Sequence, residues 1–116
     1  MLDHCSILVA EDEGLIALDL QMTLEDEGAT VVGPYSTVES CLDAVEKQSF
    51  DFAILDVNLR GRNVFPVAEK LIRRGIPFVF HTGHGDRIEL LKKFPDAKVY
   101  RKPTEIHHLI ENLASR

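Results

Sequence analysis

The sequence predicts an α/β domain in which helices cover both faces of a parallel five-stranded sheet. Short apolar runs alternate five times along the chain with segments whose apolar residues recur at helical spacing. The runs are continuously apolar, which is typical of strands buried on both faces of a sheet. The 116 residues contain no repeat, linker or low-complexity tract, and they match the size of one domain. We therefore expect a single three-layer (βα)5 sandwich.

The first strand, residues 7–10, stops abruptly at the acidic run from Glu11 to Glu13. Over residues 15–24 the apolar side chains recur at helical spacing, which predicts a helix with a wide buried face. The expected members of this face are Leu15, Ile16, Leu18, Leu20, Met22 and Leu24. Gly28 is expected to end the helix, because glycine adopts the left-handed conformation common at helix C-termini. Residues 30–33 then form the second strand.

The second helix is predicted to begin at a capping box over residues 36–39. There the Ser36 hydroxyl and the Glu39 side chain would satisfy each other's backbone amides. This helix is expected to bury the apolar residues Val38, Leu42 and Val45. Residues 52–55 form the third strand, which also ends at an acid, Asp56.

A loop over residues 58–62 separates the third strand from the third helix. Asn63 can cap this helix, and Pro66 suits its first turn, where a missing backbone amide costs little. Gly75 is expected to end it.

The last two strands, residues 76–80 and 98–100, flank a short helix over residues 86–94. Thr104 can cap the final helix, whose apolar stripe has the spacing i, i+3, i+4, i+7. The stripe consists of Ile106, Leu109, Ile110 and Leu113. Since crossovers between parallel strands are right-handed, few topologies are open, and we expect the flavodoxin-like strand order 2-1-3-4-5.

In such a sheet, ligands bind beyond the carboxyl ends of the strands, where the strand order switches. Strand one ends at Glu11 and Asp12, strand three at Asp56, strand four at Thr82 and strand five at Lys102. One divalent cation would balance three carboxylates and one ammonium, and the oxygen ligands favour Mg²⁺. This set predicts phosphoryl chemistry. The cation and Lys102 would neutralise phosphate, the Thr82 hydroxyl would donate a hydrogen bond, and a carboxylate would attack phosphorus.

In the order and spacing of these residues, the chain resembles the receiver domain of two-component response regulators over residues 7–113. The resemblance implies that Asp56 is the phosphoacceptor and that Lys102, followed by Pro103, binds the phosphoryl group together with Thr82. It also implies a Mg²⁺ site, whose ligands would be Glu11, Asp12, Asp56 and the backbone carbonyl of Asn58. The implied phosphodonor is a histidine kinase or a histidine phosphotransfer protein, and the implied output is a protein partner or a relay.

Two positions depart from the family pattern. Val99 stands three residues before Lys102, where the family often has an aromatic switch residue, and Tyr100 follows it. Because neighbours in a strand point to opposite faces, Tyr100 is expected to point elsewhere. Residues 80–83 resemble a Phe-Ala-Thr-Gly signature of alphaproteobacterial stress and light signalling, with His81 in place of alanine. His81, Gly83 and Tyr100 are candidate modulators, and the simpler interpretation of His81 is a surface imidazole.

The composition limits the partners. Asp and Glu (19) outnumber Lys and Arg (13), and a net charge of −6 disfavours nucleic acid and anionic membranes. The apolar runs are too short to span a membrane, and residues 1–6 are too polar for a signal peptide. Cys5 and Cys41 lack metal or redox spacing, so we expect reduced thiols in a cytoplasmic protein. The resemblance to receiver domains implies a bacterial one. His107 and His108 flank the last apolar stripe and are expected to be exposed.

We expect one receiver domain over residues 1–116 with no output domain. It would not be an enzyme beyond catalysing its own phosphoryl transfer and dephosphorylation. The sequence leaves open whether it forms a homodimer. Two alternative functions also stay open. One is a pseudo-receiver that binds a partner without phosphate, and the other is a haloacid-dehalogenase-like phosphatase, which would need an acid where Asn58 stands.

Overall fold

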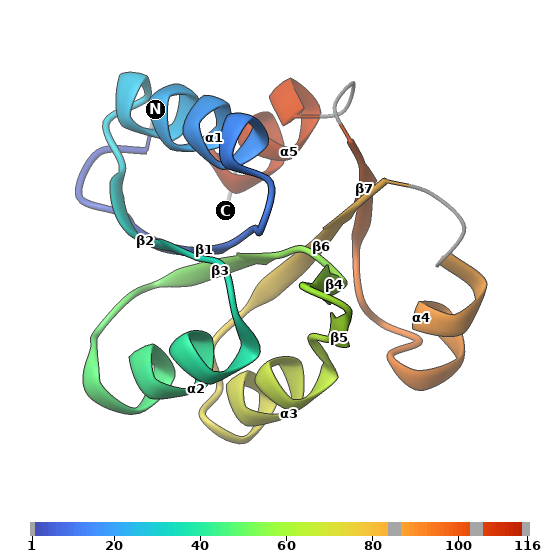
Figure 1. The fold of residues 1–116 in the computed structure, drawn as a ribbon. Helices are drawn as coiled ribbons and strands as arrows, with labels where there is room; N and C mark the ends of the chain where they lie inside the picture. The colour runs from blue at the N-terminus through green and yellow to red at the C-terminus, as the bar shows by residue number, and fades with distance from the viewer. Residues whose placement is uncertain (1, 84–86, 103–105, 115–116) are drawn as a thin grey trace.

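The computed structural model describes residues 2–83, 87–102 and 106–114, and its centre is a five-stranded parallel sheet (Figure 1). The strands of this sheet are β1 (Ser6–Ala10), β2 (Thr30–Tyr35), β3 (Phe52–Leu55), β6 (Phe78–Thr82) and β7 (Val99–Arg101). Their order is β2-β1-β3-β6-β7, and all neighbours pair in parallel. Counted within this sheet, the order is 2-1-3-4-5, so the predicted flavodoxin-like fold is confirmed.

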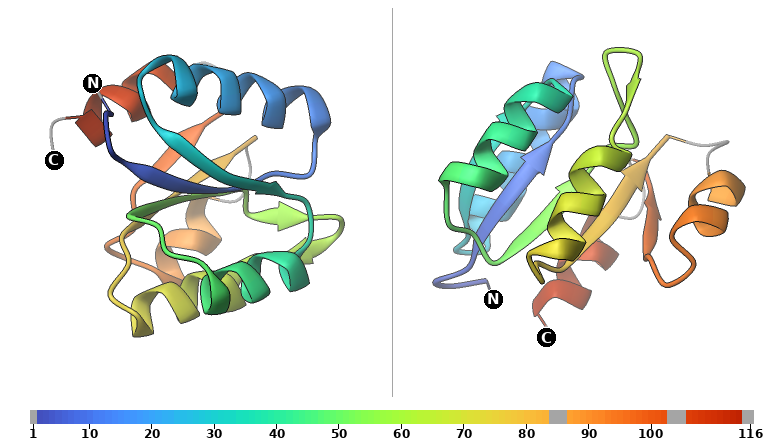
Figure 2. Two further views of the ribbon diagram at one scale, coloured as in Figure 1. Left: turned by 90° about the vertical axis from the view of Figure 1, so that its left-hand side faces the viewer. Right: turned by 90° about the horizontal axis from the view of Figure 1, so that it is seen from below.

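Helices form the two outer layers of the sandwich (Figures 1 and 2). Helices α1 (Gly14–Asp26) and α5 (Ile106–Ala114) cover one face, and α2 (Val38–Lys47), α3 (Phe65–Arg73) and α4 (Arg87–Lys93) cover the other. Alternation along the strands divides the apolar core into two clusters. Leu8, Ala53 and Phe80 pack toward α2, α3 and α4, whereas Ile7 and Val79 pack toward α1 and α5.

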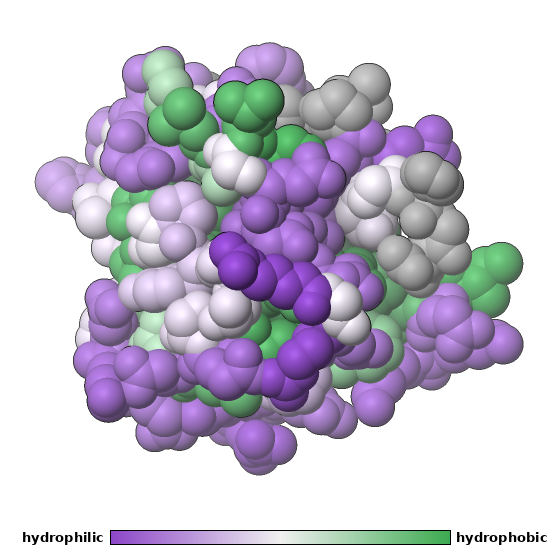
Figure 3. All heavy atoms as spheres, viewed as in Figure 1, coloured by the Kyte–Doolittle hydropathy of each residue, from purple (hydrophilic) through white to green (hydrophobic). Residues whose placement is uncertain are grey.

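The prediction that α1 has a wide buried face is wrong for three of its six apolar residues. Leu20 and Leu24 are buried, but Leu15, Leu18 and Met22 are 85%, 51% and 55% exposed. At about 100° per residue, these three side chains lie almost opposite Leu20 and Leu24 on the helix. Only one of the two stripes can therefore face the sheet. In Figure 3, hydrophobic side chains gather over α1 at the top of the view.

The cap of α2 is one residue later than predicted. Thr37 is the N-cap, and its hydroxyl accepts a 3.1 Å hydrogen bond from the Ser40 backbone amide. Glu39 does not complete the predicted capping box and instead forms an ion pair with Arg62. In the buried face of α2, Cys41 and Ala44 join Val38 and Val45, while Leu42 is only partly buried.

Glycines end α1 and α3 as predicted, with φ of 98° at Gly28 and 70° at Gly75. The start of α3 differs from the prediction, because Val64 is its N-cap. Asn63 instead accepts a 2.7 Å hydrogen bond from the Phe65 amide, and proline lies in the first turn as expected. The predicted cap Thr104 lies outside the described residues, as do Pro103 and His84.

The segment predicted as a loop over residues 58–62 contains a small antiparallel hairpin. Its strands are β4 (Asn58–Leu59) and β5 (Arg62–Asn63), which pair outside the main sheet. In Figure 2 the hairpin projects beyond the edge of the sheet. Strand β6 also ends two residues later than predicted, so His81 and Thr82 belong to the strand.

Two further expectations concern thiols and membranes. Cys5 and Cys41 are both free, and burial raises the pKa of the Cys41 thiol to about 12, which makes it unreactive. Within the described residues, the helices lack the combined length and apolar character that crossing a bilayer requires.

Candidate functional site

The three predicted carboxylates meet at the carboxyl edge of the sheet. Glu11 and Asp12 follow β1 directly, Asp56 follows β3, and these two strands are neighbours. The Asp56 amide donates to the Ala10 carbonyl (2.9 Å), and the Glu11 amide donates to the Tyr35 carbonyl (2.9 Å). One carboxylate oxygen from each acid lies within 4.8 Å of the others. The strand pairing therefore brings the backbones of these three acids together at one edge.

Lys102 reaches this acid cluster from the end of β7. Its ammonium lies 2.8 Å from Asp56 Oδ2 and 2.5 Å from Glu11 Oε1, and all three side chains are largely buried. The Lys102 amide also donates to the Thr82 carbonyl (2.8 Å), which continues the pairing of β6 with β7. Thr82 itself is buried at the end of β6, and the exposed Gly83 follows it. All five strand-end residues that the sequence singled out thus lie at one edge.

Burial and the hydrogen bonds of Lys102 together set the pKa values of Asp56 and Lys102. Burial raises the pKa of Asp56 to about 7; the hydrogen bond from Lys102 opposes this rise, and the nearby Glu11 carboxylate adds to it. Burial alone would lower the pKa of Lys102, but its hydrogen bonds to Asp56 and Glu11 outweigh this effect, so its pKa is raised. The ammonium therefore stays charged and favours the ionised form of Asp56.

The β4–β5 hairpin closes one side of the acid cluster. The Arg60 backbone amide donates to Asp12 Oδ2 (2.8 Å), and the Asn58 amide lies 3.5 Å from Asp56 Oδ1. Asn58 thus lies next to Asp56, while the expected role of its carbonyl as a metal ligand stays a prediction. Sequence reasoning missed the contact between the hairpin and Asp12. The available signal was Gly61, because glycine is the usual second residue of a two-residue hairpin turn, but the usual first residue, asparagine or aspartate, is replaced by Arg60.

His81 and Tyr100, two of the candidate modulators, are both buried. His81 is 3% exposed, so the interpretation as a surface imidazole is wrong. The reason is that β6 continues for two residues after its last apolar residue, Phe80. Tyr100 packs in the cluster below α5, its hydroxyl is hydrogen-bonded to Asn112 Nδ2 (2.7 Å), and Val99 packs toward the opposite face. Tyr100 thus points away from the face of Phe80, as alternation predicts. His107 and His108 are exposed, as expected.

The donor set fits a hard divalent cation. Three carboxylates offer oxygen atoms within one small volume, and a single ammonium offsets only part of their charge. Clustered carboxylates repel one another by several kcal/mol, roughly 4 at a surface-like dielectric, unless a cation compensates. Carboxylates, a backbone carbonyl and waters are the usual ligands of Mg²⁺. The residues present could therefore hold Mg²⁺.

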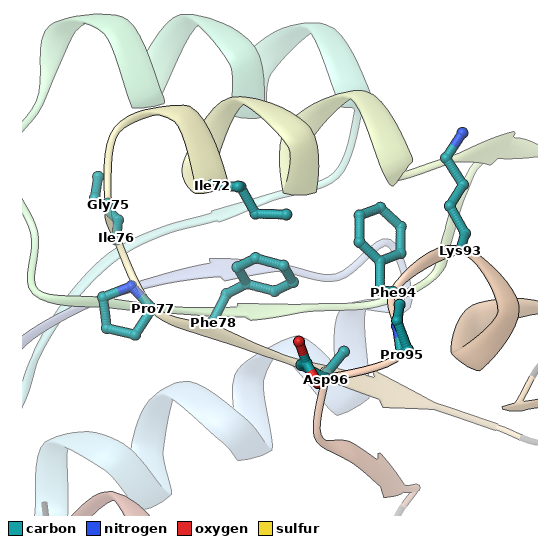
Figure 4. A pocket seen from close by; sticks show the side chains of 10 residues that line it. Ile72, Gly75, Ile76, Pro77, Phe78, Lys93, Phe94, Pro95 and Asp96 are labelled. Carbon is teal, nitrogen blue, oxygen red and sulfur yellow. The ribbon is translucent and has the colours of Figure 1, made fainter.

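A groove of about 640 Å³ lies at the other end of β6 (Figure 4). It is bordered by the end of α3, the start of β6 and the segment after α4. Apart from Lys93 and Asp96 its lining is apolar or glycine: Ile72, Gly75, Ile76, Pro77, Phe78, Phe94, Pro95 and Ala97. This groove has no part in the acid cluster, because the strands enter the sheet at this end and the acids follow the opposite ends.

Comparison with known proteins identifies the type of domain. The family model of the response regulator receiver domain matches residues 7–114. The transcriptional regulatory protein PdtaR of Mycobacterium tuberculosis is 32% identical over 108 residues, which are 90% of this chain and 52% of PdtaR. The chain thus spans about half the length of this curated relative.

Solved structures agree with this match. The solution structure of SdrG from Sphingomonas melonis Fr1 is 45% identical, with a TM-score of 0.83, over 96% of this chain and 94% of SdrG. A BeF3-activated conformation of SdrG is 44% identical with a TM-score of 0.78, over 99% and 98% of the two chains.

Proposed function

The chain belongs to the response regulator receiver family of two-component signalling, and from this we propose that it is a switch phosphorylated on Asp56. Receiver domains serve in phosphorylation-dependent signalling. The observation that carries the proposal is the cluster around Asp56: its carboxylate accepts a 2.8 Å hydrogen bond from the buried Lys102 ammonium, and the two acids that follow β1 lie beside it. Glu11 is also buried and shares this ammonium, so the choice of Asp56 rests on its place after the third strand of the sheet, where the resemblance to receiver domains puts the phosphoacceptor.

The proposed reaction is phosphoryl transfer from a phosphohistidine. An Asp56 carboxylate oxygen forms a bond to phosphorus while the phosphorus–nitrogen bond breaks, and the imidazole leaves with the electron pair and takes up a proton. Lys102 neutralises the transferred group, and the Thr82 hydroxyl donates a hydrogen bond to it. Glu11, Asp12, Asp56 and the Asn58 carbonyl would hold Mg²⁺, which when bound supplies further positive charge to the phosphoryl oxygens.

The donor is proposed to be a histidine kinase or a histidine phosphotransfer protein. The exposed apolar stripe of Leu15, Leu18 and Met22 suits part of its docking surface, because α1 begins two residues after Asp12. A donor seated there would have its phosphohistidine next to the acid cluster. We propose that the phosphorylated domain signals through, or relays to, a protein partner, and that it turns over no exogenous phosphomonoester.

The experiment is an intact-mass measurement after incubation with acetyl phosphate and Mg²⁺, and separately with a histidine phosphotransfer protein phosphorylated on histidine. We expect a gain of one phosphoryl group that EDTA prevents. Asp56→Asn should abolish the gain, whereas Asp43→Asn, which removes an exposed carboxylate paired with Lys47, should leave it unchanged. Lack of uptake from both donors would overturn the proposal and favour the phosphate-independent pseudo-receiver.

A further inference from the structure

Arg60 has a backbone conformation that side-chain-bearing residues seldom adopt. Its φ is 51°, and the φ of the next residue, Gly61, is 82°. Both residues lie between the paired residues Leu59 and Arg62, which makes them a two-residue turn with positive φ at both central positions. Asparagine is the preferred residue at the first of these positions, because it tolerates the left-handed region. A strained arginine beside a functional site indicates a constraint worth explaining.

The amides of this turn are both directed to side chains at or next to the acid cluster. The Arg60 amide donates to Asp12 Oδ2 (2.8 Å), and the Gly61 amide donates to Asn58 Oδ1 (2.9 Å). The left-handed turn therefore presents a backbone donor to a carboxylate that follows a different strand, 48 residues earlier in the sequence. Asp12 is the least buried of the three acids, so its side chain gains most from being fixed.

The hairpin that carries this turn is anchored to the body of the domain. Leu59 is fully buried in the cluster under α2 and α3, and Arg62 forms an ion pair with Glu39 of α2. At the base of the hairpin, the Val64 amide donates to the Val57 carbonyl (2.8 Å). The Arg60 amide is thus held from both strands of the hairpin.

We propose that the Arg60-Gly61 turn is a positioning element for Asp12: the Arg60 amide holds one carboxylate oxygen and leaves the other to bind Mg²⁺. This inference rests on the proposed function. The role belongs to the backbone amide and not to the exposed guanidinium. Groups that orient a metal ligand in this way typically change metal affinity by roughly 10–100-fold when they are removed.

The test compares Arg60→Gly with a second chain that differs from it only at the backbone amide of residue 60. Arg60→Gly removes the guanidinium, keeps the amide and relieves the strain of a positive φ. The second chain, assembled by chemical ligation with glycolate replacing residue 60, differs from Arg60→Gly only by an ester oxygen in place of the N–H. For each chain, calorimetric titration gives the Mg²⁺ dissociation constant, and urea unfolding in EDTA gives the stability of the metal-free fold.

We expect Arg60→Gly to bind Mg²⁺ within about twofold of the natural chain, and the ester chain to bind roughly ten-fold or more weakly. Equal affinity of the ester and amide chains would overturn the positioning role, even if the ester lowered stability. A large loss in Arg60→Gly itself would assign the effect to the guanidinium and also overturn it. If the natural chain bound no Mg²⁺ and took up no phosphoryl group, the proposed function would fall as well, so the two failures are distinguishable.

Discussion

Lys102 donates a 2.8 Å hydrogen bond to the carboxylate of Asp56, although 46 residues separate them in the sequence. The bond joins the ends of β3 and β7 across the end of β6, which lies between them in the sheet. It provides the cluster of acids with an internal cation. The stability and the chemistry of this edge should therefore both depend on one ammonium group.

Replacing this ammonium should destabilise the fold strongly. Lys102→Met leaves Glu11 and Asp56 buried without their cation, and breaking a buried ion pair in this way costs about 3–5 kcal/mol. Urea unfolding at pH 8, low salt and in EDTA measures the loss. The matched control is Lys47→Met, which breaks an exposed, solvent-screened pair with Asp43 and should change the stability little. Equal losses in the two variants would contradict the role of Lys102.

The raised pKa of Asp56 predicts a pH dependence of stability. Between its ordinary pKa near 4 and its folded value of about 7, the folded chain holds a proton on Asp56 that the unfolded chain has released. Raising the pH through this window therefore lowers the contribution of Asp56 to stability, and the loss is complete above pH 7. The contribution of Lys102, whose pKa is also raised, persists through this window and is lost only at higher pH.

Asp56→Asn should remove this slope and stabilise the metal-free chain at pH 8, because it removes a carboxylate whose ionised form is disfavoured by burial. Urea unfolding at pH 5 and pH 8 in EDTA measures both changes. Asp43→Asn serves as the control for removing a carboxylate and should keep the slope of the natural chain. An Asp56→Asn chain less stable than the natural one at pH 8 would mean that the bond to Lys102 outweighs burial.

The hydroxyl of Thr82 should matter for the transfer reaction. Removing one donor to a developing negative charge typically slows a reaction about 10²–10³-fold. Thr82→Ala should therefore slow phosphoryl uptake from acetyl phosphate by this order, whereas Thr82→Ser, which keeps the hydroxyl, should retain most of the rate. Intact mass against time gives the rates, and urea midpoints show whether both variants fold. Similar rates for the two variants would exclude a hydroxyl role.

The exposed apolar stripe of α1 should affect the rate of phosphoryl transfer from a protein donor and not from a small-molecule donor. Leu18→Ser should change the free energy of unfolding by less than about 0.5 kcal/mol, because the side chain is half exposed. Uptake from acetyl phosphate should be unchanged, while transfer from a phosphorylated histidine phosphotransfer protein should fall about tenfold, which corresponds to 1.4 kcal/mol. Ile72→Ser, at an equally exposed apolar residue in the other helical layer, should leave both rates intact.

The strand topology and the acid cluster could be predicted because both follow from strand ends. Continuous apolar runs mark buried parallel strands, and the residue after each run must lie at the carboxyl edge. The orientation of α1 could not be predicted, because the sequence offers two apolar stripes on opposite sides and does not say which faces the sheet. Leu18 and Leu20 are equally apolar, and only packing distinguishes them.

The hairpin and the burial of His81 escaped prediction for different reasons. Strands of two residues, such as β4 and β5, are too short to show a periodic pattern. His81 follows an apolar run and carries a polar ring, so it has the appearance of a strand end. The strand continues because β7 pairs with it: His81 is in register with Tyr100, and Thr82 with Arg101.

The separate placements of the two tyrosines give the chain two optical reporters. There is no tryptophan, so tyrosine dominates the ultraviolet emission. Tyr100, hydrogen-bonded to Asn112 of α5, should register whether the last helix is docked. Tyr35, whose hydroxyl accepts a 2.7 Å hydrogen bond from Gln48 at the end of α2, should register whether that helix is docked. Substituting either tyrosine by phenylalanine would leave one emitting ring, so that local unfolding of α5 and of the end of α2 can be followed independently.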